Sequence, residues 1–264
     1  MDRKFNLVFS TSKRLNYFQI TLRSLIEKNP GIGDLVEKVF ILDDRSSQQD
    51  REMMRFLASH YFGLSKVHLI TFDCEKPYGY VEKLNFLEKL SSGGEHTFFM
   101  EDDWECIDQL GLEVHIDTLN DSEIDVITFT ENFFIQEQAQ REYSYINDTY
   151  WKNPWPMSFR HTIEQSPTGM LFWAEVGINN FSLNPSLIKA GVWKKSKFLK
   201  ETEYELKFSD PLNLRQYFTL THKFLHIGKI SYEEKSEANL KAKADIAEWT
   251  GDGSGVSEQN GQLQ

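Results

Sequence analysis

The first hundred residues repeat one pattern, in which a short apolar run leads into a polar turn and then into a helical pattern. Apolar runs of strand length lie at 6–9, 39–42, 67–72 and 97–100. Apolar residues recur at helical spacing between these runs, at 15–26, 53–57 and 80–90. This alternation is typical of β-α-β units, so we expect an α/β fold with a mainly parallel central sheet flanked by helices.

The polar turns that follow the predicted strands are the first candidates for a binding site. Their residues are, in chain order, Ser10 and Thr11, then Asp43 and Asp44, then Glu101, Asp102 and Asp103. Ligands of open α/β sheets bind beyond the carboxyl ends of the strands. We therefore expect the three turns to converge there.

The acidic triplet at 101–103 is the clearest sign of chemistry. Three carboxylates at one strand end repel each other unless a cation lies among them, and Mg²⁺ or Mn²⁺ prefers such oxygen ligands. The apolar run at 98–100 and Trp104 behind the triplet indicate a fixed, partly buried turn. A solvated acidic turn is the alternative. With 40 acidic residues among 264, acidic triplets of this kind are also expected by chance. Asp43 and Asp44 similarly have a structural alternative, which is to open a turn and cap the next helix.

Charge and cysteine content exclude several classes of function. The chain has 29 basic and 40 acidic residues, a net charge of -11, and no long basic block, so nucleic acid is not an expected partner. Cys74 and Cys106 lack the spacing of a zinc or redox site and read as free thiols of a reducing compartment. With neither a signal-type apolar segment nor a transmembrane-length run, we expect a cytoplasmic protein.

The second half of the sequence is less regular. We expect a strand at 126–129, loops across the aromatic and proline-containing stretch 150–159, and a helix that starts at Asn184-Pro185. A second helix is predicted at 201–208 and a late strand at 223–227. A charged helix is expected at 233–249, and the composition of 250–264 predicts a disordered tail.

Three blocks together carry a family resemblance: Phe9-Ser10-Thr11, the run 41–47 with Asp43-Asp44, and Phe99-Met100-Glu101-Asp102-Asp103. Their order and spacing resemble the nucleotide-binding half of GT-A glycosyltransferases, especially the family-2 group, over roughly residues 5–110. The resemblance implies a Rossmann-like GT-A domain over 1–249. Its nucleotide-sugar-binding half would span about 1–110, its acceptor-binding half about 111–230, and a C-terminal helix 231–249.

The resemblance also implies a metal-dependent transfer of a sugar from a nucleotide diphosphate to an acceptor hydroxyl. The nucleotide-sugar contacts would be Ser10, Thr11, Arg14, Asp43, Asp44, Lys83 and Asp102. Asp43 or Asp44 would read the base, and Asp43 could pair with the imide of uracil, so a UDP-sugar is favoured although guanine also offers donors to a carboxylate. Lys83 would lie against the pyrophosphate, with a solvated helix lysine as its alternative.

For the metal, Mn²⁺ or Mg²⁺, the resemblance implies a D-x-D-like site. Asp103 would be the direct ligand, and Glu101 would support the ion through water, although many relatives have Asp at its position. His226, in a run of apolar neighbours, resembles the C-terminal histidine that completes this site in many GT-A enzymes. A structural core histidine is the alternative.

An inverting transfer needs a carboxylate base beside the acceptor hydroxyl. Glu203 is the first candidate and Glu201 the second, because their segment stands where the resemblance implies the family's acceptor loop and acidic helix start. The segment lacks the Glu-Asp pair that is usual in the family. Acids that merely favour a helix's first turn are the alternative. Trp151 and Trp155 could stack on the acceptor sugar, with core packing as their alternative.

Two other functions fit parts of the pattern. A sugar-phosphate nucleotidyltransferase would normally carry a glycine-rich phosphate loop after the first strand, and residues 10–14 contain no glycine. A catalytically inactive GT-A domain that binds glycan or protein is disfavoured by the intact acidic triplet.

Overall fold

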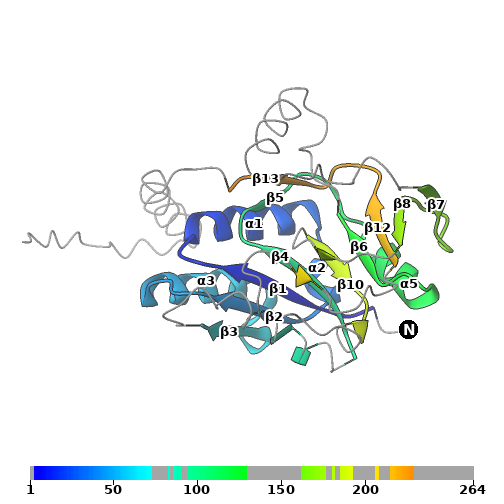
Figure 1. Cartoon of the computed structure of the whole chain (residues 1–264). Coiled ribbons are helices and arrows are strands. Elements are labelled where there is room, and N and C mark those ends of the chain that lie inside the picture. The colour runs from blue at the N-terminus through cyan, green and yellow to red at the C-terminus, as the bar shows by residue number, and fades with distance from the viewer. Residues whose placement is uncertain are drawn as a thin grey trace, which may run out of the picture.

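The computed structural model describes residues 3–72, 83, 86, 87, 89, 90, 94–129, 162–176, 180–181, 185–192, 206–207 and 215–228. These residues form a nine-stranded sheet with strand order β3-β2-β1-β4-β10-β6-β12-β8-β7 and two small two-stranded sheets. Figure 1 shows the large sheet crossing the molecule from β3 to β7. Cys74, the predicted helix 231–249 and the predicted tail 250–264 lie outside the described residues.

The first half of the sheet is parallel, as the sequence predicts. It consists of β1 (Phe5–Thr11), β2 (Val36–Asp43), β3 (Val67–Thr71) and β4 (His96–Glu101). The helices between these strands are α1 (Leu15–Lys28), the short α2 (Ile32–Leu35), α3 (Gln48–Phe62) and a 3-10 turn at Leu64–Lys66. The described residues of the predicted helix 80–90 are also helical.

The second half of the sheet is mixed. Strand β10 (Ser186–Ile188) runs antiparallel between β4 and β6 (Val126–Thr128). Beyond β6 lie β12 (Arg215–Thr219), parallel to β6, and then β8 (Leu171–Val176) and β7 (Thr162–Gln165) in antiparallel pairs. Helix α5 (Leu112–Asp121) precedes β6. The small sheets pair β5 (Trp104–Cys106) with β13 (Phe224–His226), and β9 (Asn180–Phe181) with β11 (Leu206–Lys207).

Two predicted helices of the second half are wrong. The chain after Pro185 is strand β10, and its three residues are all buried because they fill the gap between β4 and β6. Short apolar runs cannot be assigned to helix or strand by periodicity alone, and here the sheet partners decide. The segment predicted as a helix at 201–208 is described only at 206–207, where it forms strand β11. The predicted strands at 126–129 and 223–227 are confirmed as β6 and β13.

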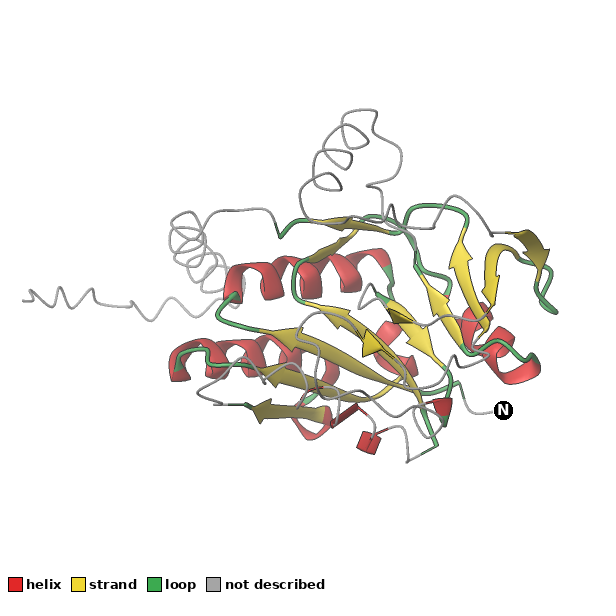
Figure 2. Ribbon diagram, viewed as in Figure 1, coloured by secondary structure: helices red, strands yellow, loops and turns green. Residues whose placement is uncertain are grey.

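The large sheet has an apolar core on each face. One core joins alternate residues of β1 and β2 to the buried sides of α1, α3 and α5, including Phe9, Phe18, Leu57 and Ile116. Figure 2 shows α1 and α3 running alongside the parallel strands. The opposite core contains Val8, Phe40, Phe99, Val126, Ile188 and Leu87, the last of which belongs to the helical residues after Lys83. The sheet is therefore covered on both faces, which fixes its strand ends in place.

Helix boundaries follow local sequence signals. Ser47 and Asp50 have the sequence spacing of a helix capping pair. In the structure Ser47 caps α3, and its Oγ accepts a hydrogen bond from the Asp50 backbone N–H at 3.1 Å. Asn29 caps the C-terminal end of helix α1, and its backbone N–H donates to the carbonyls of Leu25 and Ile26. Cys106 is a free, buried thiol, as expected. None of the helices that the structure describes has the length and apolar character needed to cross a bilayer.

Candidate active site

The three polar turns converge at the carboxyl ends of β1, β2 and β4, as predicted. Thr11 is in register with Asp43 of β2, and Ser10 with Glu101 of β4. The turns continue this pairing, because the Asp44 N–H donates to the Thr11 carbonyl and the Asp102 N–H to the Ser10 carbonyl, both at 3.0 Å. The site is thus an extension of the sheet's own hydrogen bonding.

Asp102 is fully buried, and both of its carboxylate oxygens are engaged. Thr11 Oγ1 donates to its Oδ2 at 2.6 Å, and Arg14 Nη2 lies 2.6 Å from its Oδ1. Its backbone carbonyl accepts from Thr21 Oγ1 of α1, also at 2.6 Å. Asp102 therefore ties together β1, α1 and the end of β4.

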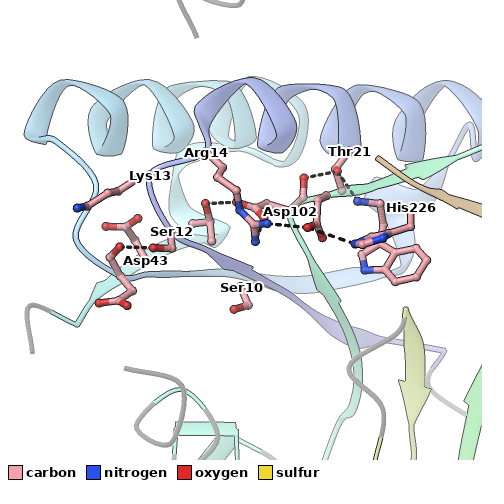
Figure 3. Close-up of polar contacts among 12 residues, drawn as sticks. Ser10, Ser12, Lys13, Arg14, Thr21, Asp43, Asp102 and His226 are labelled. Atoms are coloured by element: carbon pink, nitrogen blue, oxygen red, sulfur yellow. Dashed lines mark hydrogen bonds and ion pairs between the residues drawn. The ribbon is translucent and has the colours of Figure 1, made fainter. Parts of the chain in front are cut away.

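Arg14 and His226 both contact Asp103. Figure 3 shows these two side chains reaching the acidic turn at Asp102 from opposite sides. Arg14 Nη1 is 2.6 Å from Asp103 Oδ2, and His226 Nε2 is 3.4 Å from the same oxygen. The histidine arrives through the pairing of β13 with β5, in which His226 is opposite Trp104 and the two rings lie 4.7 Å apart. The predicted proximity of the late histidine to the acidic triplet is present in the structure.

Gly228 packs against the side chains of Asp103 and His226. A Cβ built on Gly228 would lie 2.4 Å from Asp103 Oδ2 and 3.0 Å from His226 Nε2. Only a residue without a side chain leaves these two groups where they are. Gly228 is a site residue that the sequence pattern around His226 does not identify.

The Asp43–Asp44 turn is built differently. Asp43 is fully buried, with Arg51 Nε 2.7 Å from its Oδ2 and with the Ser46 hydroxyl and N–H also donating to its carboxylate. The Asp44 side chain is 16% exposed and lies 3.2 Å from Arg45 Nε. Asp43 therefore shapes the turn, and Asp44 is the more accessible of the two carboxylates.

Lys83 is buried rather than solvated, with 6% of its surface exposed. Its Nζ donates to Ser10 Oγ at 3.1 Å and to the Thr11 carbonyl at 3.0 Å. Burial lowers the pKa of this ammonium, although nearby carboxylates, first among them Asp102, act in the opposite direction. The lysine thus brings a cation beneath the turn after β1.

The carboxylates of the triplet differ in their electrostatics. Burial, followed by the Asp103 charge, raises the pKa of Glu101 to about 7, and burial raises the pKa of Asp102 to about 7 against the opposing effect of Arg14. Burial acts on Asp103 in the same direction, but the His226 hydrogen bond and the Arg14 charge outweigh it and lower the pKa of Asp103. Asp103 is therefore the carboxylate best kept ionised.

The potential metal ligands at the turn fit a divalent cation whose remaining ligands come from substrate phosphates and water. Among the described residues, no group donates a hydrogen bond to the buried Asp103 Oδ1, which leaves a carboxylate lone pair available. His226 supplies an imidazole nitrogen beside the same carboxylate. Across the described ranges, no group of three or more His, Cys, Asp or Glu side chains is placed to hold a metal by itself. Two protein ligands suit Mg²⁺ or Mn²⁺ when substrate phosphates and water complete the shell.

Thr21 is a site residue that sequence reasoning missed. Besides its bond to the Asp102 carbonyl, its hydroxyl accepts from the Trp104 N–H at 3.2 Å, so it holds both sides of the Asp103 turn. The signal available in the sequence was a polar residue on the apolar face of α1, between Phe18 and Leu22.

The remaining predicted site residues lie outside the described part of the chain. They are Glu201 and Glu203, the candidate bases, and Trp151 and Trp155, the candidate acceptor contacts.

Comparison with solved structures places this architecture among known folds. The chain aligns over 99% of its length with residues 1–349 of S. aureus TarS, at a TM-score of 0.52 and 15% identity, and spans 67% of that chain. It spans 40% of a longer TarS chain, at a TM-score of 0.55 and 14% identity. Mannosyltransferase PcManGT from Pyrobaculum calidifontis, in complex with GDP-Man and Mn²⁺, matches 93% of the chain at a TM-score of 0.53 and 11% identity, with 64% of its own length covered.

These likenesses establish the fold. The chain has the GT-A fold, an α/β architecture with a mainly parallel sheet flanked by helices, as the sequence predicts. No protein-family model matches the sequence, and a search of curated proteins found no match.

Proposed function

We propose that this chain is a metal-dependent glycosyltransferase that moves a sugar from a nucleotide diphosphate to an acceptor hydroxyl. One observation carries the proposal: on a GT-A fold, Asp103 and His226 meet at the carboxyl edge of the sheet beside the turn after β1. Fold alone does not define an activity, so the argument rests on the chemistry of this site.

The residues have separate tasks in this proposal. Asp103 and His226 would hold Mn²⁺ or Mg²⁺, with Glu101 nearby to accept hydrogen bonds from water. When bound, the ion would supply a Lewis acid to the diphosphate oxygens. Ser10, Thr11 and Lys83 would line the nucleotide side of the site, and the Lys83 ammonium would provide positive charge near the departing diphosphate.

The identity of the nucleotide depends on the turn after β2. Both carboxylate oxygens of Asp43 already accept hydrogen bonds inside the protein, whereas Asp44 is partly exposed. We therefore favour Asp44 over Asp43 as the group that reads the base. A carboxylate can accept from the imide of uracil or from guanine, so both UDP- and GDP-sugars belong in the test, with UDP favoured.

For the acceptor half, the proposal keeps Glu203 as the base and Glu201 as the second candidate. An in-line attack opposite the diphosphate would invert the anomeric configuration. Trp151 and Trp155 remain the proposed surfaces for the acceptor sugar.

The test is nucleotide release from a panel of UDP- and GDP-sugars, measured with Mn²⁺, with EDTA, and in Asp103→Asn. This substitution keeps the shape of the side chain and removes its charge. We expect metal-dependent release to fall by at least about 100-fold, since loss of one charge-stabilising group at a reaction centre typically costs about 2.7–4 kcal/mol. Asp121→Asn, which neutralises an exposed acid at the end of α5, is the matched control and should retain full release.

Two other results would contradict the proposal. Release that is insensitive to EDTA would exclude the metal's role. Absence of release from every donor, together with retained glycan binding, would instead favour a non-catalytic GT-A domain.

A further inference from the structure

Arg14 occupies an unusual position for a cation at a site that would bind another cation. It lies three residues after the end of β1 and immediately before the first residue of α1, and 23% of its side chain is exposed. Its two terminal nitrogens each contact a different aspartate, with both N–O distances at 2.6 Å. The guanidinium also lies 6.0 Å from the centre of the Tyr17 ring. Figure 3 shows the side chain aimed at the acidic turn.

These contacts use most of the available carboxylate oxygens. On Asp102, Arg14 takes one oxygen and Thr11 the other. On Asp103, Arg14 shares Oδ2 with His226, so that Oδ1 is the oxygen left without a donor among the described residues. With Arg14 in place, the protein can offer a cation few ligands. The remaining ligands would come from a diphosphate and from water.

The local charge leads to the same conclusion. The three carboxylates of the triplet, when ionised, are opposed by the fixed charges of Arg14 and Lys83, which leaves a single negative charge. A divalent cation alone would reverse the sign of the site, whereas a divalent cation with a diphosphate would not. Burial makes such an imbalance costly, because nearby charges interact more strongly away from bulk water.

We propose that Arg14 is a tethered cation that competes with the divalent metal, so that the metal binds tightly only together with a nucleotide diphosphate. This inference rests on the proposed function, since it concerns the same metal and donor. Arg14 is a positioning residue in this scheme. Its positive charge offsets the repulsion between the Asp102 and Asp103 carboxylates until the donor binds. By linkage, the metal would strengthen nucleotide binding by the same factor by which the nucleotide strengthens metal binding.

The test is Mn²⁺ binding, followed by the loss of the free-ion electron paramagnetic resonance signal, with and without UDP or GDP. No turnover is needed. Without nucleotide, Arg14→Gln should bind Mn²⁺ about tenfold more tightly than the wild type, within the range of roughly 5- to 150-fold typical of coupled sites. The enhancement of Mn²⁺ affinity by the nucleotide should shrink by the same factor.

Two further variants separate charge from geometry. Lys13→Gln removes the same charge from the exposed neighbouring position and should bind Mn²⁺ as the wild type does. Arg14→Lys keeps the charge but cannot contact both aspartates with one planar group, so its affinity should lie between those of the wild type and Arg14→Gln. If Arg14→Gln fails to fold, Arg14→Lys carries the test by the same criterion.

Equal or weaker Mn²⁺ binding by both Arg14 variants would overturn the inference. Because this result would leave metal-dependent nucleotide release intact in the wild type, it is distinguishable from failure of the proposed function. Absence of Mn²⁺ binding in every variant, even with UDP or GDP, would overturn both.

Discussion

Adjacent aspartates have different tasks in this molecule. Asp102 joins β1, α1 and β4 through a hydrogen bond to one carboxylate oxygen, an ion pair at the other and a hydrogen bond to its carbonyl. On Asp103, both contacts are made at Oδ2, and the described residues donate no hydrogen bond to the buried Oδ1. Successive residues of a turn point in different directions, so one can face the protein and the other the site. We therefore assign the structural role to Asp102 and propose the metal-binding role for Asp103.

Gly228 allows a test of this arrangement at a single atom. In Gly228→Ala, the new methyl group would lie 2.4 Å from Asp103 Oδ2, so the carboxylate or the β13 end must move. We expect metal-dependent nucleotide release to fall by about tenfold or more, because overpacking costs roughly 1–3 kcal/mol and about 1.4 kcal/mol is a factor of ten. The measurement is release rate against Mn²⁺ concentration.

Gly33→Ala is the matched control for Gly228→Ala. The nearest atoms to its added Cβ are at 3.9 and 4.0 Å, which is ordinary contact distance. Gly33→Ala should release nucleotide at the wild-type rate. If Gly228→Ala is just as active as this control, the close packing of Asp103 against residue 228 has no functional importance.

His115 predicts how stability depends on pH. It is 1% exposed and lies against Phe129 and Phe172, and burial lowers its pKa from 6.5 to about 4. Above the unfolded-state pKa, both states hold a neutral ring. As pH falls from 6.5 towards 4, only the unfolded state takes up the proton, so the free energy of unfolding decreases, by roughly 3 kcal/mol at about 1.4 kcal/mol per pKa unit.

Urea unfolding of the wild type and His115→Met between pH 7 and pH 4 measures this contribution. Methionine fills a similar volume without titrating. The contributions of all other titratable groups cancel in the difference between the free energies of unfolding of the two proteins. The wild type should lose stability relative to the variant as the solution is acidified. A constant difference across this range would show that His115 is not the group responsible.

At the scale of elements, side chains of helix α1 pair with backbone N–H groups of β5. Its Thr21 and Ser24 hydroxyls accept hydrogen bonds from the backbone N–H groups of Trp104 and Cys106, at 3.2 and 2.9 Å. The Asn29 side chain then accepts from the Leu110 N–H at 2.9 Å. Buried backbone donors must be paired, and here polar side chains of a helix pair them. This packing fixes β5, and through β5 it fixes the β13 strand that carries His226.

The start of α3 provides a prediction confined to one element. Ser47→Ala removes the hydroxyl that accepts from the Asp50 N–H and should lower the free energy of unfolding by about 1 kcal/mol. For a domain of this size, that corresponds to a fall in Tm of about 2–4 °C. Ser47→Asp retains an acceptor and should stay close to the wild type in the same thermal melt. If both variants melt alike, the cap bond does not stabilise α3.

At the scale of the whole molecule, the site depends on segments far apart in the sequence. The Asp103 turn lies in the first half of the chain, yet the Ile227 N–H donates to the Asp103 carbonyl at 2.9 Å, and His226 completes the cluster. The two halves of the large sheet are joined by β10, which inserts between β4 and β6. His96 reinforces this junction, because its Nδ1 accepts from the Ala190 N–H and its Nε2–H therefore donates to Asn120 of α5.

Sequence alone determined the parallel half of the sheet, the capped helix α3 and the convergence of the turns after β1, β2 and β4. Those features follow from local periodicity, and parallel strands necessarily bring their carboxyl ends to one edge. The prediction that His226 joins the acidic triplet relied on family resemblance, because nothing local to residues 224–228 specifies a partner.

Only the tertiary structure decided the rest. Residues 186–188 form a strand because β4 and β6 provide partners on both sides, which overrides the helix expected after Pro185. Arg14, Thr21 and Gly228 acquire their roles from contacts with residues about 80 to 125 positions away, between which no periodicity exists. Patterns in a sequence report which way a side chain faces, whereas the identity of what it meets is set by how distant segments pack.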